Sequence, residues 1–164
     1  MRTFAIAATS LALASAAPAL HAQAVQLNGY AAYGFADEYK FGVGLRAVGA
    51  SAPFALLGGR TVHAGARAMY FMGDDDVATG EPRSYYVALE LGTEVHRRMG
   101  HALRAELLVG SARYFATDVT DELLISPGVS IRFGAGRVSL GAELRYLYAK
   151  DHDAVTIGGS IGLP

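Results

Sequence analysis

The stretch SYYVALELGTEVH, residues 84–96, carries the pattern that decides the fold. One face of it is apolar and includes Leu89 and Leu91. The alternate face is small or charged and includes Glu90 and Glu94. Successive side chains of a β-strand point to opposite faces, so this period of two predicts a strand between an apolar and a polar environment.

The same alternation recurs along the chain, and breaks rich in Gly and Asp separate the alternating segments. We therefore predict an all-β domain in which antiparallel strands close into a single up-and-down, eight-stranded barrel. The strands are approximately residues 25–35, 39–48, 60–72, 84–96, 101–115, 123–133, 137–149 and 154–163. The stretch 49–59 fits a long turn, a short helix or an extension of the third strand.

The first residues have the features of a secretory signal peptide. Arg2 supplies a positive charge, residues 4–14 are apolar and uncharged, and small residues follow. The apolar run is shorter than the roughly 20 residues that a membrane-spanning helix needs. We predict a signal peptide over 1–22, with cleavage after residue 22 or 24, and a barrel over 23–164.

Composition removes several classes of function. A chain of 164 residues fits one domain, and 52% hydrophobic residues are incompatible with a disordered chain. The sequence has no Cys, so disulfides, thiolate zinc sites and cysteine nucleophiles are excluded. The net charge of −1 argues against a nucleic-acid partner.

Alternation alone does not say which face is inside. A lipocalin-like barrel has its apolar face inside, whereas a membrane barrel has it outside. The abundance of Gly, Ala and Ser on the polar face favours the membrane barrel, because a narrow lumen accepts only small residues beside its large ones. Aromatic residues near strand ends match the girdles of such barrels. These are Tyr39, Phe41, Tyr70, Tyr85, Phe133, Tyr146 and Tyr148.

The charges are also partitioned as a membrane barrel requires. With the N-terminus in the periplasm, most acids fall in outer loops: Asp37, Glu38, Asp74, Asp75, Asp76, Glu81, Asp118, Asp121, Glu122, Asp151 and Asp153. Four arginines fall at the periplasmic side: Arg60, Arg97, Arg98 and Arg137. Only Arg113 has lipid-facing parity, near the outer end of its strand. A mid-membrane charge on that face would cost roughly 2–4 kcal/mol.

Arg83 and Lys150 also fall in outer loops, and the remaining charges lie on the polar face and are expected to fill the lumen. They are Lys40, Arg46, Arg67, Glu90, Glu94, Arg104, Glu106, Arg132, Glu143 and Arg145. Buried charges must be paired, so we predict an ion-pair network that plugs the barrel. An alternative is a narrow pore, to which six cations and four carboxylates would give a weak anion preference.

This pattern resembles the small outer-membrane barrels of the OmpA/OmpX type over the whole mature chain. The last strand is similar to the signal read by the barrel-assembly machinery, at Thr156, Gly158, Ile161 and Leu163. It departs from that signal because Leu replaces the usual aromatic residue and Pro164 follows. The resemblance implies a monomeric outer-membrane protein, in contact with membrane lipid and lipopolysaccharide, with a structural or surface-interaction role and no cofactor.

Other functions have weaker support. His63 and His96 share the polar face, where either could act as a base or metal ligand. Lipid A deacylases of this size carry a His-x-Ser pair, and none of the five histidines here is followed by Ser two residues on. We therefore do not expect an enzyme, although a lipid-active enzyme and a periplasmic lipocalin-like binding barrel remain alternatives. Asp74, Asp75 and Asp76 are weak candidates for a Ca²⁺ site.

Overall fold

The computed structural model of the chain describes residues 25–163, apart from 55–56, 58–59, 73–82, 99, 116–118 and 136–137. The expected signal peptide and Asp74, Asp75 and Asp76 lie outside the described residues. No helix in the part that is described is long and apolar enough to cross a membrane.

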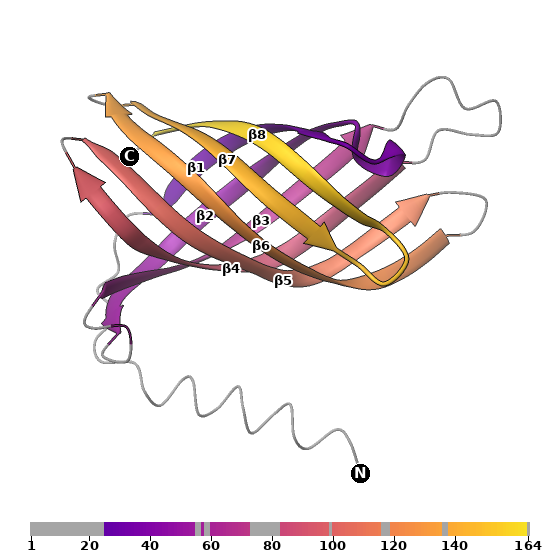
Figure 1. The fold of residues 1–164 in the computed structure, drawn as a ribbon, viewed down its shortest axis with the longest axis horizontal. Helices are drawn as coiled ribbons and strands as arrows, with labels where there is room; N and C mark the ends of the chain where they lie inside the picture. The colour runs from indigo at the N-terminus through magenta and orange to yellow at the C-terminus, as the bar shows by residue number, and fades with distance from the viewer. Residues whose placement is uncertain are drawn as a thin grey trace, which may run out of the picture.

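The strands form one closed antiparallel barrel in the order β1-β2-β3-β4-β5-β6-β7-β8, and β1 pairs with β8 (Figure 1). Their bounds are β1 Gln26–Gly34, β2 Phe41–Phe54, β3 Arg60–Met72, β4 Arg83–Arg98, β5 His101–Phe115, β6 Val119–Ala135, β7 Val138–Tyr148 and β8 Asp153–Leu163. A short 3-10 helix, η1 (Asp37–Tyr39), connects β1 to β2. The predicted fold class and number of strands are confirmed.

The two ends of the barrel, called the terminal end and the loop end, differ in the segments that lie there. At the terminal end β1 begins and β8 ends; at the loop end η1 connects the first two strands (Figure 1). At the terminal end, Gly100 lies in the turn between β4 and β5 with φ of 83°. That backbone conformation is one that glycine adopts readily and that other residues rarely do.

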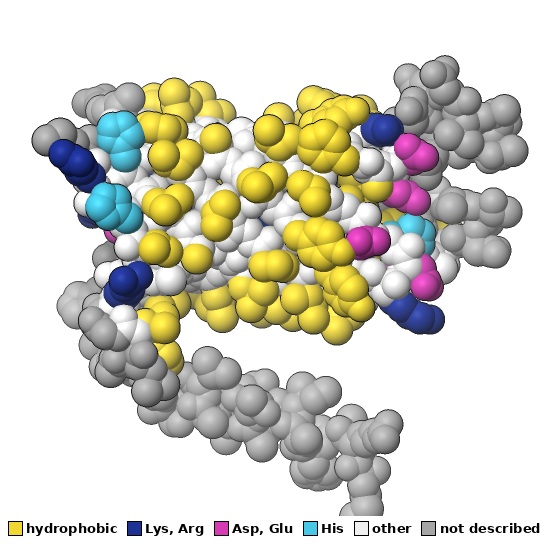
Figure 2. Space-filling model, in the orientation of Figure 1, with side chains coloured by type: hydrophobic (Ala, Val, Ile, Leu, Met, Phe, Trp, Pro, Cys, Tyr) yellow, Lys and Arg dark blue, Asp and Glu magenta, His cyan; other side chains and the backbone are white. Residues whose placement is uncertain are grey.

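The apolar face of the strands points outward. Leu89 is 71% exposed and Leu144 is 52% exposed, whereas their neighbours Glu90 and Arg145 are each 2% exposed. On the face that Figure 2 shows, apolar side chains form a belt across the middle of the barrel, and charged side chains gather at its two ends. The choice of the membrane-barrel arrangement over a lipocalin-like one is therefore confirmed.

Within the stretch 49–59, residues 49–54 extend the second strand, which differs from each of the three interpretations of the sequence. β2 continues to Phe54 and pairs with β3 as far as Arg60. A register shift between Val48 and Ala50 shows a β-bulge at this point. The bulge admits an extra residue, so the strict alternation that marks a strand in the sequence is lost there.

A second bulge corrects the position predicted for His96. Regular alternation would place His96 in the lumen with Glu94, but the β4–β5 register shifts between these two residues. His96 consequently pairs with the outward-facing Leu103 and is exposed. The two histidines therefore do not share a face, because His63 remains partly buried.

The loop end also differs from expectation. Tyr39, predicted to belong to an aromatic girdle, lies in η1 and is only 1% exposed. Asp121 and Glu122, predicted to lie in a loop, belong to β6, which begins at Val119. Asp121 pairs across the ladder with Arg113 and accepts two hydrogen bonds from its guanidinium, at 2.5 and 2.6 Å. Arg113, expected to be the only charge with lipid-facing parity, therefore has a partner at the matching outward position of the adjacent strand.

Candidate functional site: the barrel lumen

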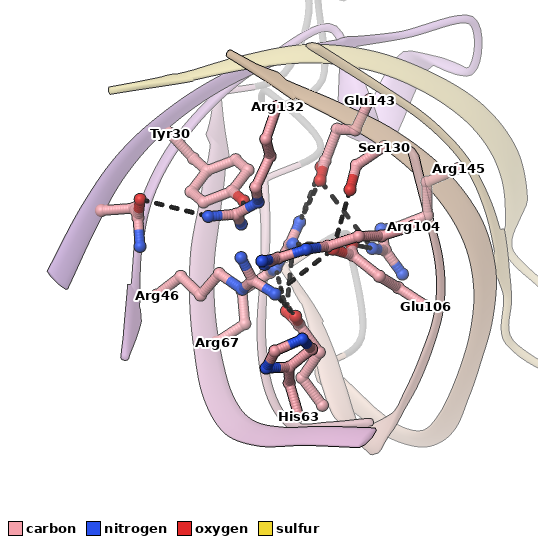
Figure 3. A network of polar contacts seen from close by, with 12 residues as sticks. Tyr30, Arg46, His63, Arg67, Arg104, Glu106, Ser130, Arg132, Glu143 and Arg145 are labelled. Atoms are coloured by element: carbon pink, nitrogen blue, oxygen red, sulfur yellow. Dashed lines mark hydrogen bonds and ion pairs between the residues drawn. The ribbon is translucent and has the colours of Figure 1, made fainter. Parts of the chain in front are cut away.

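A cluster of buried ion pairs fills the middle of the lumen. This central ion cluster consists of Arg46, Arg67, Glu90, Glu106, Glu143 and Arg145, all 8% exposed or less (Figure 3). Arg67 donates to Glu143 at 2.6 and 2.8 Å and to Glu90 at 3.1 Å. Each side chain comes from an alternate, inward-facing position of its strand, so the closed sheet brings together residues far apart in the sequence.

Carboxylates from opposite strands compensate neighbouring cations. Arg46 and Arg67 occupy directly opposed positions of β2 and β3, where two like charges would repel. Arg46 donates to Glu90 and, at 3.2 Å, to Glu106. Glu106 also accepts from Arg145 at 2.8 Å and from the hydroxyl of Ser130 at 2.8 Å. The carboxylate of Glu106 thus connects both sides of the cluster.

Arg145 also compensates for a proline in the sheet. Pro127 of β6 has no N–H to donate, and the β6–β7 pairing is interrupted between Ile125 and Gly128. The guanidinium of Arg145 donates to the carbonyl of Ser126 at 2.9 Å, inside this gap. A lumen cation therefore satisfies a buried carbonyl in the interrupted stretch of ladder.

Glycines in the lumen leave room for these long side chains. A Cβ at Gly128 would lie 3.0 Å from the Cζ of Arg145. A Cβ at Gly42 would lie 2.5 Å from the ring of Phe71. These contacts give a packing reason for glycine on a face that otherwise carries large residues.

The lumen near the terminal end holds a looser group of polar residues. Glu94 accepts from Arg104 at 3.0 Å and from Arg97 at 2.8 Å, and it lies 3.7 Å from Nε2 of His63. Arg132 donates to the hydroxyl of Tyr30 at 3.0 Å, as Figure 3 shows. The polar part of the lumen therefore reaches from the middle of the barrel to its terminal end.

Tyr30 connects this group to the central ion cluster. The guanidinium of Arg67 lies over its ring, 4.2 Å from the centroid. Tyr30 thus presents its ring face to one buried arginine and its hydroxyl to another. A cation over an aromatic face is electrostatically favourable, and more so away from water.

The half of the lumen toward the loop end is apolar, which the sequence analysis did not predict. This outer apolar layer includes Met69, Phe71, Tyr86, Leu108, Tyr114, Leu124 and Leu147, all 3% exposed or less. Leu124 and Leu147 occupy lumen-facing parity in the sequence, so their positions could have revealed the layer. The prediction of a uniformly polar lumen face fails here because the face changes from polar to apolar along each strand.

η1 holds Tyr39 in the loop end of the lumen. The Tyr39 ring packs edge-on against Phe71 at 5.1 Å between centroids, and its hydroxyl bonds that of Tyr114. Ser84 donates to the carbonyl of Glu38 at 2.8 Å and so fixes the helix to β4. Burial, followed by the hydrogen bond with Tyr114, raises the pKa of Tyr39 far above its usual value. Tyr39 therefore stays neutral and covers the outer apolar layer at the loop end.

The structure brings together nine of the ten predicted lumen charges, with Lys40 as the exception. β2 begins only at Phe41, so Lys40 lies at the loop end, 3.3 Å from Asp37 of η1, with its side chain 27% exposed. Without Lys40 the lumen has five arginines and four glutamates. Its excess of cations is one rather than the expected two.

Three residues of the expected assembly signal follow the alternation of β8. Thr156 is buried, and its hydroxyl donates to the carbonyl of Arg145 at 3.5 Å. A Cβ at Gly158, on the same face, would lie 3.0 Å from the carbonyl oxygen of Ala31. Ile161 is 59% exposed on the outer face, and the Leu163 backbone pairs with Leu27 to close the barrel.

Comparisons with known proteins agree with this geometry. No protein-family model and no curated protein matches the sequence. Among solved structures, the N-terminal β-barrel domain of Pseudomonas aeruginosa OprF matches with a TM-score of 0.60 and 12% identity, over 85% of this chain and 95% of that one. The chain has the fold of the small outer-membrane barrels. Neisserial surface protein A matches with a TM-score of 0.53 and 14% identity, over 85% of this chain and 94% of that one.

Proposed function

We propose that the chain is an integral outer-membrane protein whose closed barrel has a structural or surface-interaction role. The observation that carries the proposal is the filled lumen, in which the outer apolar layer lies above the central ion cluster. An eight-stranded barrel is narrow enough for side chains to fill, and these side chains are buried. A lumen packed in this way favours a structural membrane protein over a channel.

The outward apolar belt supports the membrane location. We infer export through the N-terminal signal peptide, insertion by the barrel-assembly machinery, and a monomer surrounded by lipid, with lipopolysaccharide in the outer leaflet. The terminal end would then face the periplasm and the acidic loop end the exterior. Both barrel termini lie at one end, because eight up-and-down strands return the chain to its starting side.

The orientation can be tested on a chain that has no cysteine of its own. The exposed Lys150 and Arg98 mark the loop end and the terminal end. In intact cells, a bulky polymer-linked maleimide is expected to label K150C and to label R98C only after the outer membrane is opened. Labelling of R98C alone in intact cells would reverse the proposed orientation.

Conductance separates the closed barrel from the alternative of a narrow pore. The one-cation excess in the lumen is the observation that favours a weakly anion-preferring pore. In planar bilayers we expect the purified, folded barrel to give no steps above the order of tens of picosiemens. Reproducible larger steps with anion preference would replace the closed-barrel proposal with the pore.

A lipid-active enzyme is the remaining alternative. His63, the lumen histidine, contacts Glu94, and its Nε2 has no hydrogen-bond partner among the described residues. Catalysis by such a histidine would also require a hydroxyl nucleophile within reach. Mass spectra of lipid A from cells with and without the protein are expected to be identical; a shift by one acyl chain would show an enzyme.

A further inference from the structure

The rim of the barrel at the terminal end is basic. Arg60, Arg97 and Arg98 are exposed there, together with His96 and His101, whereas most described acids lie at the loop end (Figure 2). Among the described residues, no carboxylate lies within 4 Å of the Arg60 or Arg98 guanidinium. The rim therefore carries positive charge that the described part of the chain leaves partly uncompensated.

A pocket of about 320 Å³ opens within this rim, between the start of β3 and the end of β4. It is lined by Arg60, Thr61, Glu94, Val95, His96 and Arg97. The single acid, Glu94, already accepts from Arg97 and Arg104, and its side chain is only 17% exposed. The pocket is therefore electropositive despite its carboxylate.

The bulge in β4 gives the pocket its composition. The register shift between Glu94 and His96 directs His96 outward beside the exposed Val95. Without the bulge, His96 would point into the lumen. The bulged strand thus places the imidazole of His96 at the outer surface of the rim. Arg97 pairs with the buried Ala102 on the lumen side and donates to Glu94, with its side chain 69% exposed at the rim.

The surroundings of the pocket indicate an amphiphilic ligand. Val95 is 44% exposed within it, and Leu103, which pairs with His96, is 41% exposed on the outward apolar face. A ligand held here would contact guanidinium groups on one side and the apolar belt on the other. Arginine binds phosphate oxygens through two parallel N–H donors, which suits an anionic headgroup.

We propose that this pocket binds the phosphate of an anionic phospholipid, such as phosphatidylglycerol, in the bilayer leaflet that surrounds the terminal end. The inference rests on the proposed membrane location of the barrel. Arg60 and Arg97 hold the phosphate, His96 donates to it, and the acyl chains follow the apolar surface at Val95 and Leu103. Free phosphate would use the arginines but not the apolar surface.

Native mass spectrometry of the folded protein in a neutral detergent tests the proposal. Phosphatidylglycerol and phosphatidylethanolamine with identical acyl chains are added in equal amounts. We expect about fivefold more phosphatidylglycerol bound to the unchanged protein, since each basic group near a lipid surface favours anionic lipid. In the double variant R60Q/R97Q, this preference is expected to disappear.

The matched control R113Q/K150Q removes two cations from the loop end and should keep the preference. If R60Q/R97Q does not fold, R60Q alone is used and should lower the preference at least twofold. Three results would overturn the proposal: no preference in the unchanged protein, equal loss in both double variants, or full displacement of lipid by inorganic phosphate at equal concentration. A barrel that is found in the soluble fraction of cells would instead overturn the proposed membrane function.

Discussion

Glu106 shows at the scale of one residue why the lumen is hard to alter. Its carboxylate accepts from Arg46 and Arg145, and it is buried with them. Taking charges out of water is costly, and the cost is recovered only while every member of the cluster keeps its partners. The central ion cluster is thus more sensitive to the loss of one member than an apolar core of similar volume.

The substitution E106Q is expected to lower the free energy of unfolding by about 3–5 kcal/mol, because it leaves a buried guanidinium without its counter-charge. Unfolding is measured in a urea titration of the refolded barrel. The folded fraction at each urea concentration is read from the change of gel mobility on boiling. D37N is the control, since Asp37 is exposed and pairs only with Lys40 at the loop end among the contacts observed. Equal midpoints for E106Q and D37N would show that the cluster contributes little to stability.

The charges of the lumen could be predicted from sequence because parity alone assigns a residue to a face. Nine of the ten charges follow that rule. Lys40 does not, because a 3-10 helix rather than a strand precedes it, and helix η1 is too short to give a periodic signal. Individual partners, such as Glu143 for Arg67, could not be predicted, since they depend on which strands lie opposite one another across the closed barrel.

At the scale of a strand, β6 contacts two different environments through alternate residues. Leu123 is 63% exposed on the outer face, and Leu124 is fully buried in the outer apolar layer. Lipid can fill the space left by a truncated side chain on the outer face, whereas the closed lumen cannot. The same substitution at adjacent positions should therefore have different consequences.

We expect L124A to destabilise the barrel by about 2–5 kcal/mol, the range for a buried leucine that leaves a cavity. L123A is its matched partner and should cost at least about 1 kcal/mol less, because no internal cavity forms. Both values come from urea unfolding of the barrel in lipid vesicles. Losses of the same size would mean that the layer at the loop end is not tightly packed.

Irregular strands mark the limit of prediction at this scale. The bulge in β4 changes the face of His96, and β2 continues past its own bulge to Phe54. A bulge inserts one residue without a distinctive composition, so periodicity locates the strand but not the point where its parity changes. The outer apolar layer is not evident from alternation for a related reason, because the environment inside the barrel changes along the strand as well as across it.

At the scale of the molecule, the sheet has an apolar outer surface whose exposure to water would be unfavourable. Val129, Leu89 and Leu144 are about half exposed or more, and they belong to a belt of apolar side chains around the middle of the barrel (Figure 2). Contiguous exposed apolar surface of this kind indicates contact with another apolar phase. The whole-chain partition of charge could be predicted because it depends on parity and loop position, both of which the sequence displays.

Depth in the bilayer gives the sharpest test of this arrangement. Val129 lies in the middle of β6 and is 49% exposed, whereas Val119 begins the same strand at the loop end and is 60% exposed. In lipid vesicles V129R is expected to cost about 2–4 kcal/mol, and V119R about 0–1 kcal/mol, because the cost of an arginine on the lipid face falls from the bilayer midplane toward the interface. Both variants add the same charge to the same strand, so β-propensity and net charge cancel in the comparison. If the two unfold at the same urea concentration, the belt does not lie in hydrocarbon, and the membrane location of the barrel is wrong.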